Sequence, residues 1–202
     1  MQALERGTMP TMPDGTEHLA GSGYELQHDN ERLQGQVRQL RAEQQRLAVQ
    51  VADLARLYSA SCRLHEPQER PVLAEVIGEI IKDLIGAEEF ALFELEPGAP
   101  TLSLLDSMGV EPEPLRHVPV GEGLIGRVAR TGTRWVAETA PTREAEPSAC
   151  IPLKSGGRVH GVVAIFRLLP HKPGYTSTDR AFFELLETQA GRALHHIVRV
   201  SG

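Results

Sequence analysis

A leucine occurs at every seventh position along the N-terminal part of the chain, and this spacing restricts the segment to a helix with one apolar seam. The leucines are Leu26, Leu33, Leu40, Leu47 and Leu54. If they occupy the d positions of a heptad repeat, the a positions hold Asn30, Val37, Gln44, Val51 and Tyr58. Leucine at d with valine and one asparagine at a is typical of a parallel two-stranded coiled coil. The pattern predicts a dimerisation helix over residues 24–62, with a seam formed by Leu26, Asn30, Leu33, Val37, Leu40, Leu47, Val51 and Leu54.

Such a helix needs a second helix to cover its leucines. Residues 26–58 would span about 50 Å at 1.5 Å per residue, and a single helix of this kind is marginal in water. Each leucine buried at d would contribute about 1.5–3 kcal/mol. The alternative is a long amphipathic helix folded back on its own domain, but the narrow stripe favours a two-helix seam. Few charged residues occupy the e and g positions, where charges select the partner helix, so a heteromeric coiled coil is an alternative to the homodimer.

Composition narrows the class of protein. The chain has 202 residues, 41% hydrophobic and 24% charged, which fits one globular domain plus an appendage. Its net charge of -6 argues against a nucleic-acid partner, and no apolar run approaches the ~20 residues of a membrane span. Two distant cysteines, Cys62 and Cys150, predict a reduced protein of the cytoplasm. We expect no metal, no cofactor and no membrane partner.

The rest of the chain divides into a tail and a domain. Residues 1–23 contain scattered glycine and proline without an apolar period, which predicts a disordered tail. Residues 63–202 alternate between element types and predict one α+β domain, an antiparallel sheet with flanking helices. The expected elements are a helix from Pro71 to Gly86, strands near 89–96, 101–107, 115–120, 134–138, 148–153 and 158–167, a short helix over 124–131, and a last helix behind a capping box of Thr176 and Asp179.

Three stretches of this domain resemble signature segments of GAF domains. The segment from His117 to Glu138 resembles the central signature, in which a strand runs into Gly-Glu-Gly, a short helix and a Thr-Gly turn. Ser148 to Arg167 is similar to the family's hairpin, with its Pro-Leu strand end and glycine turn. Asp179 to Ala193 is similar to the last helix. The resemblance covers about residues 63–199 and implies a GAF-like fold, whose first and last helices usually pack against a partner's.

The glycines of the central stretch also match a nucleotide-binding pattern. Gly121, Gly123 and Gly126 give G-x-G-x-x-G, and Glu138 follows where a ribose-binding acid would stand. A dinucleotide site needs a buried strand before the loop and a full crossover helix after it, and this helix is too short. We therefore expect the glycines to form a tight turn and to let the short helix pack closely.

Other candidate sites give way to structural interpretations. Cys62 and His65 lack the second ligand pair of a structural metal site, and the adjacent His195 and His196 point in different directions on a helix. We expect Cys150 to be a small core residue opposite about Val163. GAF-type sulfoxide reductases use several cysteines, and bilin-binding relatives attach through a cysteine next to a histidine. Neither pattern occurs around Cys150, and the protein is expected not to be an enzyme.

The resemblance also implies where a ligand pocket would lie, between the sheet and a lid that precedes the Pro-Leu strand. Here that connection, residues 139–147, is short and polar, and the asparagine, lysine, aspartate and glutamate set of cyclic-nucleotide-binding members is not recognisable. The candidate pocket wall is Phe93, Leu104, Trp135, Cys150 and Phe166. We expect a dimeric regulatory or adaptor protein of intracellular signalling that acts through protein contacts and has no output domain after Gly202. The alternative is a sensor of a cyclic nucleotide or metabolite that relays its ligand state to a partner.

Overall fold

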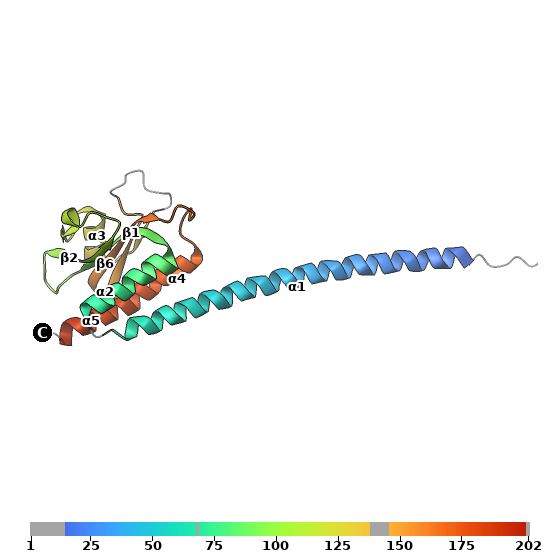
Figure 1. The fold of residues 1–202 in the computed structure, drawn as a ribbon, viewed down its shortest axis with the longest axis horizontal. Helices are drawn as coiled ribbons and strands as arrows, with labels where there is room; N and C mark the ends of the chain where they lie inside the picture. The colour runs from blue at the N-terminus through green and yellow to red at the C-terminus, as the bar shows by residue number, and fades with distance from the viewer. Residues whose placement is uncertain (1–14, 68, 138–145, 201–202) are drawn as a thin grey trace, which may run out of the picture. The chain divides into compact units, whose positions relative to one another are not determined.

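The computed structural model describes residues 15–67, 69–137 and 146–200 of the chain. Contacts divide the chain into an N-terminal unit that ends at Val51 and a C-terminal unit that begins at Ala52. The long helix α1 (Gly15–His65) contributes to both units (Figure 1). Residues 1–14 of the predicted tail lie outside the described residues, and α1 begins at Gly15.

The described part of the N-terminal unit, from Gly15 to Val51, belongs to α1. Its seam side chains are exposed in the single chain, by 54% at Leu33, 64% at Leu40 and 65% at Val51. Val37 and Leu47 are exposed as well, and Asn30 accepts a hydrogen bond from the Gln34 amide at 2.9 Å. A helix with this pattern and no cover leaves room for a second helix, and the coiled coil itself stays a prediction.

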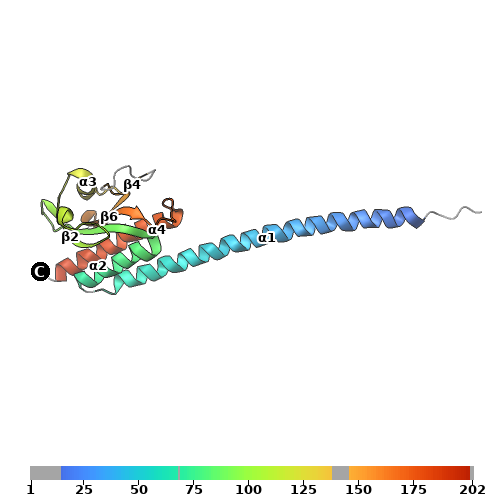
Figure 2. The ribbon, with the colours of Figure 1, turned by 45° about the horizontal axis from the view of Figure 1, so that its top comes forward.

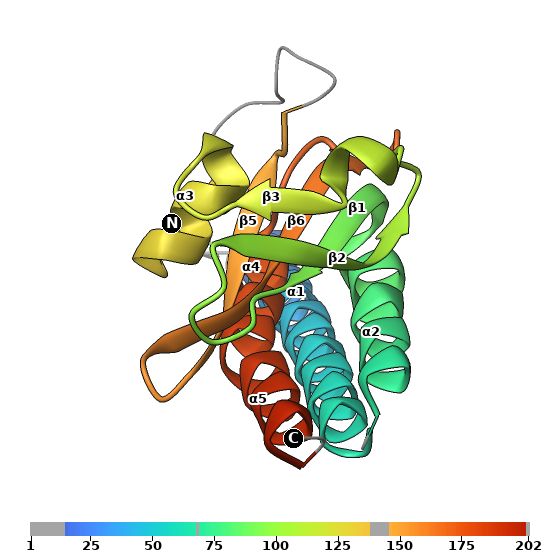
Figure 3. The same cartoon turned by 90° about the vertical axis from the view of Figure 1, so that its left-hand side faces the viewer.

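The C-terminal unit contains the predicted antiparallel sheet. Its strands are β1 (Ala87–Glu94), β2 (Thr101–Met108), β3 (His117–Pro119), β4 (Trp135–Val136), β5 (Ala149–Ser155) and β6 (Arg158–Leu168). Their order is β3-β2-β1-β6-β5-β4, and every pair is antiparallel (Figure 3). The third strand is shorter than expected because a 3-10 turn, η2 (Glu113–Leu115), precedes it. Pro112 and Pro114 in this stretch have no N–H to donate to a ladder.

Helices cover both faces of the sheet. One face carries α2 (Arg70–Glu79), α4 (Ser177–Leu185) and α5 (Gly191–Val200), and the other carries the short α3 (Gly123–Thr131) (Figures 1 and 2). Two π-helical turns extend these helices, η1 (Ile80–Ile85) after α2 and η3 (Leu186–Ala190) between α4 and α5. The arrangement is the α+β, GAF-like fold that the sequence predicted.

The local signals that end and begin these elements are confirmed. Gly86 closes the first helix in the left-handed conformation with φ 73°. Gly156 and Gly157 form the β5–β6 turn with φ 58° and 78°, a conformation that glycine adopts without strain. Thr176 and Asp179 form the capping box, since the Thr176 side chain accepts from the Asp179 N–H while the Asp179 carboxylate accepts from the Thr176 N–H.

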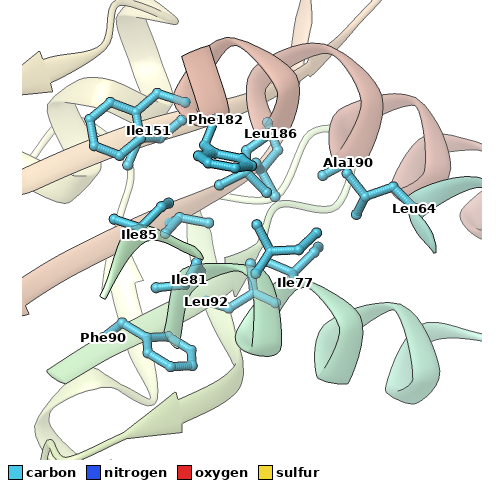
Figure 4. Packing of buried hydrophobic residues seen from close by; sticks show 14 of the residues in the cluster. Leu64, Ile77, Ile81, Ile85, Phe90, Leu92, Ile151, Phe182, Leu186 and Ala190 are labelled. Atoms are coloured by element: carbon cyan, nitrogen blue, oxygen red, sulfur yellow. The ribbon is translucent and has the colours of Figure 1, made fainter. Parts of the chain in front are cut away.

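The main core lies between the sheet and the helices α2, α4 and α5. Figure 4 shows side chains of this core that come from the sheet, α1, α2, η1, α4 and η3; they include Leu64, Ile77, Ile81, Ile85, Phe90, Leu92, Ile151, Phe182, Leu186 and Ala190. Successive residues of a strand face opposite sides, so Leu92 enters this core while Phe93 enters the smaller core beneath α3.

The last turns of α1 belong to the same unit and carry two apolar stripes. Leu57, Ala60 and Leu64 pack into the main core. Leu54 and Tyr58 stay exposed by 66% and 73%. At 100° per residue, these two stripes lie roughly 110° apart around the helix. Folding back on its own domain therefore accounts for the inner stripe and leaves the outer stripe, which continues the predicted seam, uncovered.

Candidate functional site

The smaller core beneath α3 is where the predicted pocket wall lies. Phe93 and Cys150 are fully buried there, and Phe166 is 8% exposed. Leu104 is half-buried and packs against the same cluster. From α3, Ile125 and Val128 close the cluster from above. The structure therefore brings four of the five predicted wall residues together as a packed core.

Trp135, the fifth wall residue, stands at the edge of this face. It lies on β4, opposite Cys150 in the ladder, and is 37% exposed. The connection that would form a lid lies mostly outside the described residues, because 138–145 are not among them.

The predicted partner of Cys150 is wrong by one residue. Cys150 lies opposite Ala164, and Ile151 lies opposite Val163. A ladder counted from the Gly156–Gly157 turn would place Val163 opposite Cys150, but a bulge between Leu153 and Lys154 shifts the register. Ala164 in turn lies opposite Ala91, so Cys150 occupies a place among small side chains. Burial raises the pKa of its thiol to about 12, which removes the thiolate needed for nucleophilic chemistry.

The glycine turn before α3 holds the short helix close to the strand end. Gly121 and Gly123 adopt positive φ, 95° and 57°. The Gly121 N–H donates to the Gly126 carbonyl at 2.8 Å. A Cβ on Gly126 would come within 2.1 Å of the Pro119 carbonyl oxygen, so only glycine fits there. Together with the antiparallel sheet, these contacts give the turn a packing role. Glu138, its proposed ribose ligand, lies outside the described residues.

A histidine pair lies on the α5 side of the sheet and was not predicted from the sequence. The rings of His160 on β6 and His195 on α5 have centroids 4.4 Å apart. Nε2 of His160 lies 3.3 Å from the Ser155 carbonyl oxygen. Burial is the main effect that lowers the pKa of His160 from its usual 6.5. The hydrogen bond to the Ser155 carbonyl raises this pKa in part, and the positive charges of His195 and Arg158 lower it further. The residues are far apart in sequence, so no local pattern indicated the pair.

This pair predicts acid sensitivity of the fold. Because the folded protein holds the pKa of His160 below that of the unfolded chain, protonation favours unfolding. Stability should be fully present above pH 6.5 and decline as the pH falls below that value. Thermal melts between pH 7.5 and 5.5 should show a smaller decline for His160→Gln than for the natural chain. The stability of His171→Gln, a change at an exposed histidine, should decline with falling pH as that of the natural chain does. Equal declines for all three proteins would contradict a role of His160 in the acid sensitivity.

The remaining candidates do not assemble into a metal site. Cys62 and His65 are both exposed on α1, and Nδ1 of His65 lies 2.7 Å from the Ser61 carbonyl oxygen. His196 is exposed, while His195 contacts His160. In the described ranges, no three histidine, cysteine or acidic side chains gather as metal ligands would. No helix in the same ranges is long and apolar enough to cross a bilayer.

A polar connection links the sheet edge beside Trp135 to α1. Glu187 on η3 lies 3.5 Å from Nε of Arg134 and 3.5 Å from Nζ of Lys154. Two residues further along η3, Gln189 accepts a hydrogen bond at 2.7 Å from the Ser61 hydroxyl of α1. One five-residue π-helical turn therefore touches both the β4–β5 edge and the last turns of the long helix. Single π-helical turns of this kind are frequent at functional sites.

The predicted dimerisation residues lie along α1 on its exposed side. Those with described side chains are Asn30, Leu33, Val37, Leu40, Leu47, Val51 and Leu54, all exposed. The Leu26 side chain is not among those described. Their role in dimerisation stays a prediction.

The antiparallel sheet with helices on both faces defines the fold class as α+β. The family profile described as GAF domain matches residues 67–195, more than half of the chain. The protein belongs to the GAF domain family.

Solved structures with the same fold come from several kinds of protein. The GAF domain of an Acinetobacter phosphoenolpyruvate-protein phosphotransferase is 17% identical with TM-score 0.61, over 74% of this chain and 96% of that one. The corresponding Coxiella burnetii domain is 18% identical with TM-score 0.61, over 74% of this chain and 96% of that one. A free methionine-R-sulfoxide reductase from Neisseria meningitidis is 15% identical with TM-score 0.56, over 71% of this chain and 89% of that one. No curated protein sequence matches the chain. At these identities the likeness shows the fold, which regulatory proteins and enzymes share.

Proposed function

We propose that the protein is a homodimeric regulatory module of a signalling system that acts through protein–protein contacts. One observation carries this proposal: the a and d positions of α1 from Leu33 to Tyr58 form an apolar stripe, interrupted only by Gln44, and its apolar side chains are exposed in the single chain. In a parallel pair, each leucine at d would enter a hole of the facing helix. Asn30 at an a position would face its twin and fix the register.

The domain behind the coil supports a contact role over a catalytic one. Cys150 is the one cysteine within the family match, and burial raises the pKa of its thiol to about 12. The core beneath α3 is filled by side chains such as Phe93 and Phe166. Light scattering on the full-length protein tests the proposal directly: a dimeric mass is expected, and a monomer at tens of micromolar would overturn it.

A second candidate function, a small-molecule sensor, is favoured by the connection through η3. A molecule that contacts Trp135 would move the adjacent Arg134, and Glu187 and Gln189 offer a physical route from there to Ser61 on α1. For these contacts to couple Trp135 to α1, they must have one arrangement in the ligand-free protein and another in the ligand-bound protein.

A ligand screen tests the sensor. Trp135 is the sole tryptophan, so a bound metabolite or cyclic nucleotide should change the protein's fluorescence and raise its melting temperature. In Trp135→Phe the fluorescence response should vanish, and the thermal shift of a true ligand should persist in weakened form. A flat thermal response across the screen would count against the sensor and leave the contact module standing.

A further inference from the structure

A groove separates helix α2 from strand β2 on the main-core side of the sheet. Its volume is about 470 Å³. One wall is a face of α2 that carries Ala74, Glu75 and Gly78, and the other wall is formed by Leu105, Asp106 and Met108 of β2. The volume falls within the roughly 300–1,000 Å³ of ordinary binding clefts. It is therefore large enough for a few side chains of a partner.

Small and apolar residues form the floor of the groove. At Gly78 the helix packs closely on the sheet, because a Cβ there would lie 3.2 Å from Cζ of Phe90 and 3.3 Å from Oδ2 of Asp106. Ala74 and Phe90 are buried beneath it, and Leu105 and Met108 are half-buried along the wall. The surface offered is a mixed apolar strip of the kind that anchors peptide side chains.

The rim of the groove is acidic. Glu75 is exposed on α2, and Asp106 uses Oδ1 to accept the Ser107 N–H at 2.8 Å. Among the described residues, no ion pair engages either carboxylate, whereas Glu79 already pairs with Arg63. Lys82 is the one cation among the lining side chains. Unpaired carboxylates above an apolar floor are complementary to lysine or arginine alternating with apolar residues.

We propose that this groove docks a short segment of a partner protein in which basic and apolar side chains alternate. The apolar side chains contact Leu105 and Met108, and the basic ones pair with Glu75 and Asp106. The inference rests on the proposed function, because it names the kind of partner that a contact module of this shape receives. The groove is lined by residues of α2, β2 and their neighbours, and no seam residue of α1 is among them.

Labelled hexapeptides test the docking. The probe is fluorescein-RLRLRL, with RSRSRS and ELELEL as comparisons, titrated with the full-length protein by fluorescence anisotropy. We expect saturable binding of RLRLRL, at least tenfold weaker binding of RSRSRS, and none of ELELEL. Glu75→Lys and Met108→Ser should each weaken RLRLRL about tenfold or more. Glu111→Lys, a matched charge reversal at an exposed glutamate outside the groove, should change the affinity for RLRLRL less than twofold.

The outcomes separate the groove from general attraction to an acidic protein. If Glu111→Lys weakens the peptide as much as Glu75→Lys does, or if RSRSRS binds as well as RLRLRL, the groove is not the site. Circular dichroism and melting temperature confirm that each variant is folded. Light scattering on the same samples reports the dimer: failure of the peptide with an intact dimer refutes the docking alone, and peptide binding by a monomer refutes the dimeric module alone.

Discussion

Glutamate in place of Val51 should convert the dimer to monomers, and glutamate in place of Val49 should not. Val51 occupies an a position and is 65% exposed in the single chain; Val49 occupies an f position and is 53% exposed. The two sites carry the same side chain, two residues apart on one helix. They differ in the side of the helix they occupy, because 200° separates them.

The expected cost follows from what the seam would bury. Each dimer loses two valine burials of about 1.5 kcal/mol and gains two facing carboxylates, which burial and like charge disfavour. A total of roughly 4 kcal/mol or more corresponds to about a 1,000-fold rise in the dimer dissociation constant. Val49→Glu faces water in a two-stranded coil, so its dissociation constant should stay within a few-fold.

Sedimentation velocity over a concentration series measures both constants. Circular dichroism should show that Val51→Glu loses helix as it dissociates, since an uncovered helix of this length is marginal. Equal effects of the two substitutions would mean that the seam is not the interface. A dimer that survives Val51→Glu would direct attention to other surfaces of the GAF domain.

Local sequence rules predicted those parts of the fold that depend on nearby residues. The Gly156–Gly157 turn, the Gly86 helix end and the Thr176–Asp179 capping box each depend on the conformational freedom or hydrogen bonding of a few adjacent residues. These signals and the family resemblance sufficed for the antiparallel sheet, while the pocket wall stays a prediction.

The features that sequence reasoning missed depend on contacts between distant residues. The bulge at Leu153 and Lys154 shifted the partner of Cys150, and no residue type marks such a bulge in advance. The contact of His160 with His195 and the pairing of Glu187 with Arg134 join elements that only the folded chain brings together. The groove beside Gly78 belongs to the same class, because it needs a helix and a strand at a fixed separation.

Alanine in place of Asp179 should destabilise the GAF domain more than any surface change. The carboxylate of Asp179, 2% exposed, accepts from Nζ of Lys172 at 2.7 Å and from the Thr176 N–H at 2.7 Å. Lys172 also donates to the carbonyl of Ile85, the last residue of η1. The cluster therefore joins the start of α4 to the end of the first helix.

Removing the carboxylate leaves the Lys172 ammonium, 17% exposed, without its counter-ion and the helix without its cap. Breaking a buried ion pair in this way costs about 3–5 kcal/mol, which for a domain of this size lowers the melting temperature by roughly 10 °C. Asp83→Ala, a matched change at an exposed aspartate on η1, should stay within about 0.5 kcal/mol. Urea unfolding of both variants, with Lys172→Met and the double variant Lys172→Met/Asp179→Ala completing a cycle, isolates the pair. The double variant should recover much of the loss; a cost below 1 kcal/mol for Asp179→Ala would show that water already satisfies Lys172 and that the cluster does not hold the two helices together.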